Sequence, residues 1–199
     1  QIIALLSQEV LKYYPNSPII ADVKSSQNLF NEIERLGGEP IMWKTGHSFI
    51  KSKMKEISSP LAGEMSGHIF FADRYYGYDD GIYAALRVLE LISDNYTLDN
   101  FLDNFPTTYS TPELRIECSD DKKFLIIEEL GKLLDQKGLI INKIDGLRIQ
   151  KADGWWLLRA SNTQAALVAR VEATTENSLK NIKSELEGYL KIFDLNLAE

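Results

Sequence analysis

The chain has 199 residues, of which 44% are hydrophobic and 26% charged, and a formal net charge of −7. This length and composition are typical of a globular protein of one or two domains, and no apolar run approaches the roughly 18 residues that a membrane span needs. The acidic balance argues against binding to the phosphate backbone of nucleic acids, and we expect neither a nucleic-acid nor a membrane partner.

The first residues, QIIALLSQEVLKYY, show helical spacing of apolar side chains from Ile2 onward. They lack the basic start and the cleavage site of a secretory signal. Cys118 is the lone cysteine, so an internal disulfide cannot form and a reducing compartment is expected. We therefore expect a cytoplasmic protein and, because the chain begins with Gln rather than Met, a piece of a longer chain.

Helix and strand patterns alternate in the first half of the chain. Residues 17–23 and 39–43 have the apolar character of buried strands, and residues 29–36 between them have helical spacing that stops at Gly37-Gly38. Helical spacing returns in Ile50, Met54 and Ile57.

A further strand region follows in LAGEM and HIFF (61–65 and 68–71), and then a helix with apolar residues at helical spacing. The helix carries Ile82, Ala85, Leu86, Leu89 and Ile92. Asp79 or Asp80 is placed to cap its N-terminus. This alternation predicts an α/β layer with at least partly parallel strands, that is, a mixed sheet layered with helices.

From about residue 94 to 112 the composition shifts to Asn, Asp, Thr, Ser and Pro, around one short helical piece near Phe101. We place a domain boundary here, with an α/β domain over 1–106 and a smaller α+β domain over 107–199. The second domain is expected to hold an antiparallel sheet framed by two helices. Its predicted elements are a strand over 114–118, a helix with a face of Phe124, Ile127, Leu130 and Leu134, a strand around Leu147 and Ile149, paired strands over 155–160 and 166–173 after a turn at Asp153-Gly154, and a last helix carrying residues from Leu179 to Phe193.

Glu64, Ser66 and His68 occupy alternate positions in the stretch GEMSGH. In an extended backbone their side chains would point the same way. A carboxylate and a hydroxyl can satisfy neighbouring sugar hydroxyls, and a histidine beside them can move a proton near neutral pH. Gly63 and Gly67 favour a bulge or a close approach to the backbone. The alternative is an ordinary polar strand edge in a Gly-rich turn.

His47 and Lys24 each follow a predicted strand and precede a predicted helix. Open α/β sheets usually place ligand groups at such positions. For His47 the alternative is a residue that only hydrogen-bonds at the helix start, and for Lys24 it is a solvated lysine.

The stretch RASNT supplies Arg159, Ser161, Asn162 and Thr163 between two predicted strands. Arginine can meet a phosphate with two parallel hydrogen bonds, and the hydroxyls and the amide add donors. The alternative is a hairpin turn, which prefers the same small polar residues. The sequence contains no Gly-rich phosphate loop, no zinc motif and no Asp-x-Asp cluster suited to Mg²⁺.

Taken in order, KTGHS, GEMSGH, DDGIYAALR, STPE and RASNT resemble the C-terminal half of the α-D-phosphohexomutase family, in its bacterial phosphomannomutase/phosphoglucomutase branch. The resemblance runs over essentially the whole chain. It implies family domain 3, short of its first strand, over 1–106, and family domain 4, with a fold similar to TATA-box-binding protein, over 107–199. One departure is Gln164-Ala165, where the family often has Thr or Glu followed by Pro.

The resemblance also implies a function, namely the reversible shift of a phosphoryl group between the 1- and 6-positions of mannose or glucose. The shift goes through a hexose 1,6-bisphosphate, which also acts as activator, and uses Mg²⁺ and a phosphoserine held by the N-terminal domains, so these 199 residues alone are expected to be inactive.

On this resemblance each candidate residue has a role. Glu64 and Ser66 grip sugar hydroxyls, and His47 lies near the sugar and phosphate. His68 and Lys24 are the catalytic candidates, and Lys24 also lines the substrate site. The phosphate that is not transferred is held by Arg159, Ser161, Asn162 and Thr163. A non-catalytic phosphosugar-binding module is the alternative to an enzyme.

Overall fold

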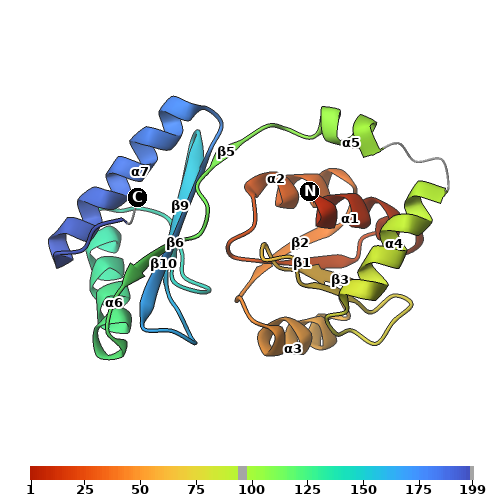
Figure 1. The fold of residues 1–199 in the computed structure, drawn as a ribbon, viewed down its shortest axis with the longest axis horizontal. Helices are drawn as coiled ribbons and strands as arrows, with labels where there is room; N and C mark the ends of the chain where they lie inside the picture. The colour runs from red at the N-terminus through yellow and green to blue at the C-terminus, as the bar shows by residue number, and fades with distance from the viewer. Residues whose placement is uncertain (94–97, 198–199) are drawn as a thin grey trace. The chain divides into compact units, whose positions relative to one another are not determined.

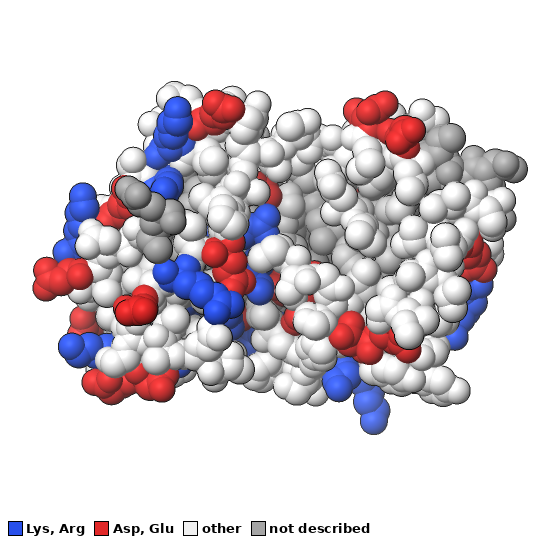
Figure 2. Space-filling view, in the orientation of Figure 1, with Lys and Arg blue, Asp and Glu red and all other residues white. Residues whose placement is uncertain are grey.

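The computed structural model describes residues 1–93 and 98–197. The chain divides into two compact units, Gln1–Pro106 and Thr107–Glu199 (Figure 1). Among the described residues no helix combines the length and the apolar character that crossing a membrane requires. On the face shown in Figure 2, basic side chains of the described residues lie beside acidic ones and form no broad basic surface.

The first unit contains a four-stranded mixed sheet in the order β2-β1-β3-β4. Strands β2 and β3 run parallel to β1, and β4 runs antiparallel to β3. This mixed sheet confirms the α/β class. Its elements are α1 Ile2–Tyr13, β1 Pro18–Asp22, α2 Gln27–Arg35, β2 Glu39–Trp43, α3 His47–Ile57, β3 Leu61–Gly63, β4 Ile69–Phe71, α4 Gly81–Ser93 and α5 Leu98–Asn104.

Helices cover both faces of this sheet, because successive strand residues point to opposite sides. Ile19 and Leu61 pack in a core with α1, α2 and α4, whereas Ile20 and Phe70 pack on the other face against α3. Figure 1 shows α1 and α2 on one side of the sheet and α3 on the other. The carboxyl ends of the parallel strands β1, β2 and β3 therefore meet at one edge, where the loops to α2 and α3 and the turn from β3 to β4 begin.

Helix α4 forms as predicted, and Asp80 caps it by accepting a hydrogen bond from the N–H of Tyr83 at 2.9 Å. The apolar residues that indicated this helix nevertheless face solvent. Their exposed fractions are 80% for Ile82, 57% for Leu86, 59% for Leu89 and 42% for Ile92. The buried face instead carries Ala84, Arg87 and Leu91, so this helix turns an arginine inward.

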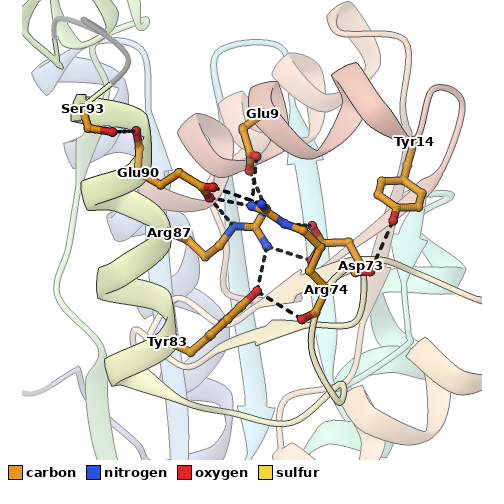
Figure 3. A network of polar contacts seen from close by, with 8 residues as sticks. All are labelled: Glu9, Tyr14, Asp73, Arg74, Tyr83, Arg87, Glu90 and Ser93. Carbon is orange, nitrogen blue, oxygen red and sulfur yellow. Dashed lines mark hydrogen bonds and ion pairs between the residues drawn. The ribbon is translucent and has the colours of Figure 1, made fainter.

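Arg87 is the centre of a buried polar network that joins α1 to α4 (Figure 3). Its guanidinium donates to Glu9 at 2.5 Å and to Asp73 at 2.8 Å, and it lies 4.3 Å from the centre of the Phe71 ring. Burial by itself would lower the pKa of Arg87, but the hydrogen bonds to Asp73 and Glu9 outweigh it, so the pKa is raised. Arg87 is therefore a fixed positive charge inside the unit, and it shares the carboxylates of Glu9 and Asp73 with Arg74.

The second unit is built on a six-stranded antiparallel sheet, which agrees with the predicted class. Strand β10 lies in its middle, with β9 on one side and both β6 and β5 on the other. The elements are β5 Tyr109–Ser110, β6 Leu114–Glu117, α6 Asp120–Gln136, β7 Ile141–Asn142, β8 Leu147–Lys151, β9 Gly154–Ala160, β10 Ala166–Ala173, α7 Glu176–Leu190 and the 3-10 helix η1 Lys191–Phe193.

Helix α6 differs from the prediction in the face that it buries. Leu130 and Leu134 are buried as expected, but Phe124 is 55% exposed and Lys123 is buried instead. The Lys123 Nζ donates to the carbonyl oxygens of Ser161 at 2.7 Å and of Gln164 at 2.9 Å. These bonds compensate the burial of the charge, which apolar periodicity alone does not anticipate.

Candidate functional site

Residues 64–68 form the turn between β3 and β4, and the extended arrangement expected for them is wrong. The N–H of Gly67 donates to the Glu64 carbonyl at 3.0 Å, and Gly67 has a φ of +98°, which favours glycine. Gly63 is needed for a different reason, because a Cβ there would lie 2.2 Å from Ile3 of α1. A close approach to this backbone therefore exists at Gly63, but it is made by the core.

The Glu64 side chain is buried and joins two loops. Its Oε1 accepts a hydrogen bond of 2.5 Å from the N–H of Gly46, which precedes α3. The Ser66 hydroxyl lies 3.4 Å from the Glu64 Oε2. Although the backbone turns, the carboxylate and the hydroxyl remain neighbours, as the predicted sugar-binding pair requires.

The two histidines of the chain lie together, with ring centres 4.3 Å apart and an angle of 70° between the rings. His68 Nδ1 lies 2.8 Å from Asp79 Oδ2, and His47 Nε2 lies 3.8 Å from the same oxygen. Both imidazoles are 44% exposed. Gly46, not His47, is the N-cap of α3, and no described side chain caps this helix. The His47 ring lies instead against the ring of His68.

Asp22 ends β1 and connects three further segments of this site. Its carboxylate accepts hydrogen bonds from the Ser25 hydroxyl at 2.8 Å, the Met65 N–H at 3.0 Å and the Thr45 hydroxyl at 3.1 Å. Lys24 Nζ lies 3.8 Å from the Asp22 carboxylate. Lys24 is only 6% exposed, so the alternative of a solvated lysine is wrong.

The predicted residues of the first unit thus gather beside the carboxyl ends of β1, β2 and β3. Ligands of open α/β sheets bind at this kind of edge. Among the described residues, ligand atoms of His47, Glu64 and His68 lie within 4.8 Å of one another. A hollow of about 690 Å³ elsewhere in the unit is lined by Tyr14, Tyr75, Tyr76 and Tyr78, among others, and by none of the predicted residues.

In the second unit, Arg159 is 6% exposed and pairs with Asp145. Its Nε and Nη2 donate to the two Asp145 oxygens at 3.0 and 3.3 Å. The Nη1 nitrogen of the guanidinium takes no part in this pair. Gly146 makes this geometry possible, because it has a φ of +89° and a Cβ there would lie 2.5 Å from the Leu158 carbonyl oxygen.

The rest of RASNT forms an exposed turn with one fixed residue. The Ser161 hydroxyl accepts hydrogen bonds from the N–H groups of Thr163 at 3.4 Å and Gln164 at 3.2 Å. Asn162 and Thr163 are exposed. Lys123, to which sequence reasoning gave no role, fixes the backbone of the turn by donating to the carbonyl oxygens of Ser161 and Gln164. The side chains of Asn162 and Thr163 between these two residues face solvent.

Sequence reasoning also missed three aspartates that lie beside predicted site residues: Asp22 beside Lys24, Asp79 beside His68 and Asp145 beside Arg159. The sequence offers Asp79 as well as Asp80 as the cap of α4, and Asp80 fills that role. Asp22 carried a signal, because it is a charged residue at the end of an otherwise buried strand.

Two protein families match the chain along its length. Residues 1–109 match the family described as "Phosphoglucomutase/phosphomannomutase, alpha/beta/alpha domain III". Residues 113–188 match "Phosphoglucomutase/phosphomannomutase, C-terminal domain".

Individual relatives agree with this match. The chain is 45% identical to the "Phosphomannomutase/phosphoglucomutase" of Pseudomonas aeruginosa over 198 residues, which is 99% of the chain and 43% of the relative. It is 44% identical to the "Phosphoglucomutase" of Neisseria gonorrhoeae over 94% of the chain and 41% of that protein. The crystal structure of a phosphoglucomutase/phosphomannomutase family protein from Burkholderia thailandensis superimposes with a TM-score of 0.89 at 41% identity, over 98% of the chain and 42% of that structure. The chain therefore spans less than half the length of the relatives that it matches.

Proposed function

Because this chain belongs to the phosphoglucomutase/phosphomannomutase family, with its two units matching domains III and IV, we propose that it is the part of such a mutase that holds the phosphorylated hexose. The whole protein would interconvert mannose or glucose 1-phosphate and 6-phosphate through a hexose 1,6-bisphosphate, in the cytoplasm. The observation that carries the proposal is the meeting of His47, Glu64 and His68 beside the carboxyl ends of the parallel strands.

The first unit has the groups that a sugar requires. Glu64 offers acceptor oxygens and Ser66 a hydroxyl, 3.4 Å apart, which suits two neighbouring sugar hydroxyls. His68 is oriented through its Nδ1 by Asp79, which leaves its Nε2 to exchange a proton with a hydroxyl of the hexose. Lys24, nearly buried beside Asp22, supplies a positive charge in the same region.

The second unit has the groups that a phosphate requires. The free edge of Arg159 can donate to phosphate oxygens, because a guanidinium carries five N–H donors and Asp145 uses only part of them. Ser161, Asn162 and Thr163 add a fixed turn with exposed donors. We assign to these residues the phosphate that is not being transferred.

The family's Mg²⁺ and phosphoserine are assigned to domains that the chain does not match. Mg²⁺ prefers an octahedron of oxygen ligands. The cluster of potential metal ligands found among the described residues contains two imidazoles and one carboxylate, so it does not fit this ion. These 199 residues alone should therefore show no turnover of glucose 1-phosphate in the presence of Mg²⁺ and glucose 1,6-bisphosphate, and turnover above background would refute this division of roles.

The test of the proposal is a pair of calorimetric titrations of the chain, with glucose 1-phosphate and with inorganic phosphate. Glu64→Gln keeps the size of the side chain but removes its charge, so it should weaken glucose 1-phosphate binding and leave inorganic phosphate binding unchanged. Equal weakening of both, with an unchanged circular dichroism spectrum, would show that Glu64 does not contact the sugar.

A non-catalytic phosphosugar-binding module remains the second candidate, since the groups described above suit the binding of a sugar phosphate and include no phosphoryl donor. The sequence that precedes Gln1 in the complete protein separates the two. A serine loop and an Asp-rich metal loop there indicate an enzyme, whereas their absence indicates a binding module.

A further inference from the structure

We propose that His47, Glu64 and His68 form a binding site for a divalent transition-metal ion of the zinc type, and that this ion competes with the sugar. The two histidines and the glutamate come from two segments far apart in the sequence, the start of α3 and the turn between β3 and β4. Each offers one ligand atom, and these atoms lie within 4.8 Å of one another.

The ligand types favour zinc over magnesium. Two imidazoles and one carboxylate are the protein ligands of many open zinc sites, in which the fourth position is left to water or substrate. Imidazole suits zinc, copper, iron and nickel, whereas magnesium takes oxygen ligands and keeps several waters. The same site therefore discriminates between zinc and the Mg²⁺ of the family.

The ligands are already supported by hydrogen bonds from their surroundings. His68 Nδ1 is paired with Asp79 at 2.8 Å, which fixes the ring and leaves Nε2 to bind a metal. Such carboxylate–histidine pairs are the usual support of zinc-bound imidazoles. Glu64 is held by the N–H of Gly46 at 2.5 Å, so its carboxylate is oriented before any ion arrives.

Only a modest movement would complete the geometry. Bonds of about 2.0–2.2 Å in a tetrahedron require ligand atoms about 3.3 Å apart, against the separation of up to 4.8 Å in this structure. His47 can supply the movement, because its side chain is 44% exposed and stands on the first residue of α3.

The consequence rests on the proposed function, because the same three side chains are assigned to the sugar. A bound ion would occupy the groups that grip the sugar hydroxyls and would block proton exchange at His68. Micromolar zinc should therefore inhibit binding of glucose 1-phosphate to the chain, and an excess of Mg²⁺ should not relieve this inhibition.

The direct test is the uptake of Zn²⁺ alone by the purified chain at pH 7.5, measured by equilibrium dialysis and metal analysis. We expect one Zn²⁺ per chain and loss of this uptake in His68→Gln and in the double variant H47Q/E64Q. Asp79→Asn should weaken the affinity about 10- to 100-fold, the usual effect of removing a carboxylate that supports a ligand histidine. Cys118→Ser is the matched control, because Cys118 is the chain's lone thiol and lies in the other unit, and it should bind as the unaltered chain does.

Absence of uptake by the unaltered chain, or uptake that persists in His68→Gln, would overturn the proposal. Circular dichroism and melting curves of each variant separate loss of the site from loss of the fold. The same samples are then titrated with glucose 1-phosphate. Sugar phosphate binding without zinc uptake contradicts the metal site alone, whereas zinc uptake without sugar phosphate binding contradicts the proposed function and leaves the metal site standing.

Discussion

Arg87 in the first unit and Arg159 in the second are both nearly buried, with exposed fractions of 3% and 6%, but their surroundings differ. Arg87 donates to Glu9 and Asp73, has Glu90 Oε2 3.5 Å from its Nε and lies over the Phe71 ring. Arg159 pairs, among the described residues, with the single carboxylate of Asp145. Arg87 therefore has more carboxylate partners than its single charge requires, which favours a role in the fold, whereas the single partner that the described residues give Arg159 is consistent with the phosphate role proposed for it.

The largest effect should come from Arg87→Met. Removing one partner of a buried ion pair costs about 3–5 kcal/mol, because the carboxylates of Glu9 and Asp73 would lose their buried partner and keep only the 47% exposed Arg74, at 3.3 and 3.7 Å. We expect a loss of this size in the free energy of unfolding of the first unit, measured by urea titration with Trp43 fluorescence. Trp43→Phe is the matched control, since it leaves only the two tryptophans of the second unit to report. A loss below 1 kcal/mol would contradict the structural role of Arg87.

The next effect should come from Arg159→Ala, and it should appear in binding. A charge-assisted hydrogen bond contributes roughly 1.5–3 kcal/mol, which corresponds to a weakening of about 10- to 150-fold. Calorimetric titration with glucose 1-phosphate measures it, with Arg87→Lys as a control in which the other buried arginine is altered. Unchanged affinity in Arg159→Ala would show that RASNT is an ordinary hairpin turn.

Gly146→Ala should have a smaller effect on the free energy of unfolding and would test how Arg159 is held. A left-handed conformation costs a residue with a Cβ about 1–2 kcal/mol, and the added carbon would lie 2.6 Å from the Arg159 Cβ, so the Asp145 loop must shift. We expect destabilisation of the second unit by at least this amount, together with weaker binding of glucose 1-phosphate. Gly138→Ala is the control, since it has a φ of +70° but open space around it.

The smallest effect concerns the pH dependence of the cap of α4. Hydrogen bonds from the Tyr75 hydroxyl and from the Tyr83 N–H lower the pKa of Asp80 below its ordinary value of 3.8. The stabilisation by this carboxylate is therefore complete above pH 3.8 and is lost as the pH falls through the lower folded value. Asp80→Asn keeps a capping side chain but cannot titrate, so melting temperatures between pH 5 and 2 should fall less steeply than in the unaltered chain. An identical slope would contradict this linkage.

Periodicity and turn residues were sufficient to predict most of the fold. The mixed sheet, the antiparallel sheet and the helices around them follow from apolar spacing, from Gly37-Gly38 and from the cap at Asp80. Periodicity failed where a buried cation replaces an apolar residue. On α4 the apolar residues predicted as the buried face are exposed, because the buried face carries Arg87. On α6 the prediction buried Phe124, whereas the structure buries Lys123.

The candidate site was predicted less completely. Motif spacing pointed to Glu64 and His68. The turn that brings these two residues together depends on the positive φ of Gly67 and on the antiparallel pairing of β3 with β4. The aspartates that lie beside the predicted residues were missed, because Asp79 lies 11 residues from His68 and Asp145 lies 14 residues from Arg159. A single sequence does not show which distant carboxylate a fold places beside a given cation.

The most direct measurement follows the imidazole nitrogen resonances of His47 and His68 while glucose 1-phosphate is titrated into the chain. The chain has only these two histidines, and His47→Gln assigns them. Binding of the sugar beside residues 64–68 predicts that both sets of resonances shift and saturate together, and that Glu64→Gln abolishes the shifts at the same concentrations. Saturating glucose 1-phosphate that leaves both histidines unchanged would contradict the assignment of the sugar to this site.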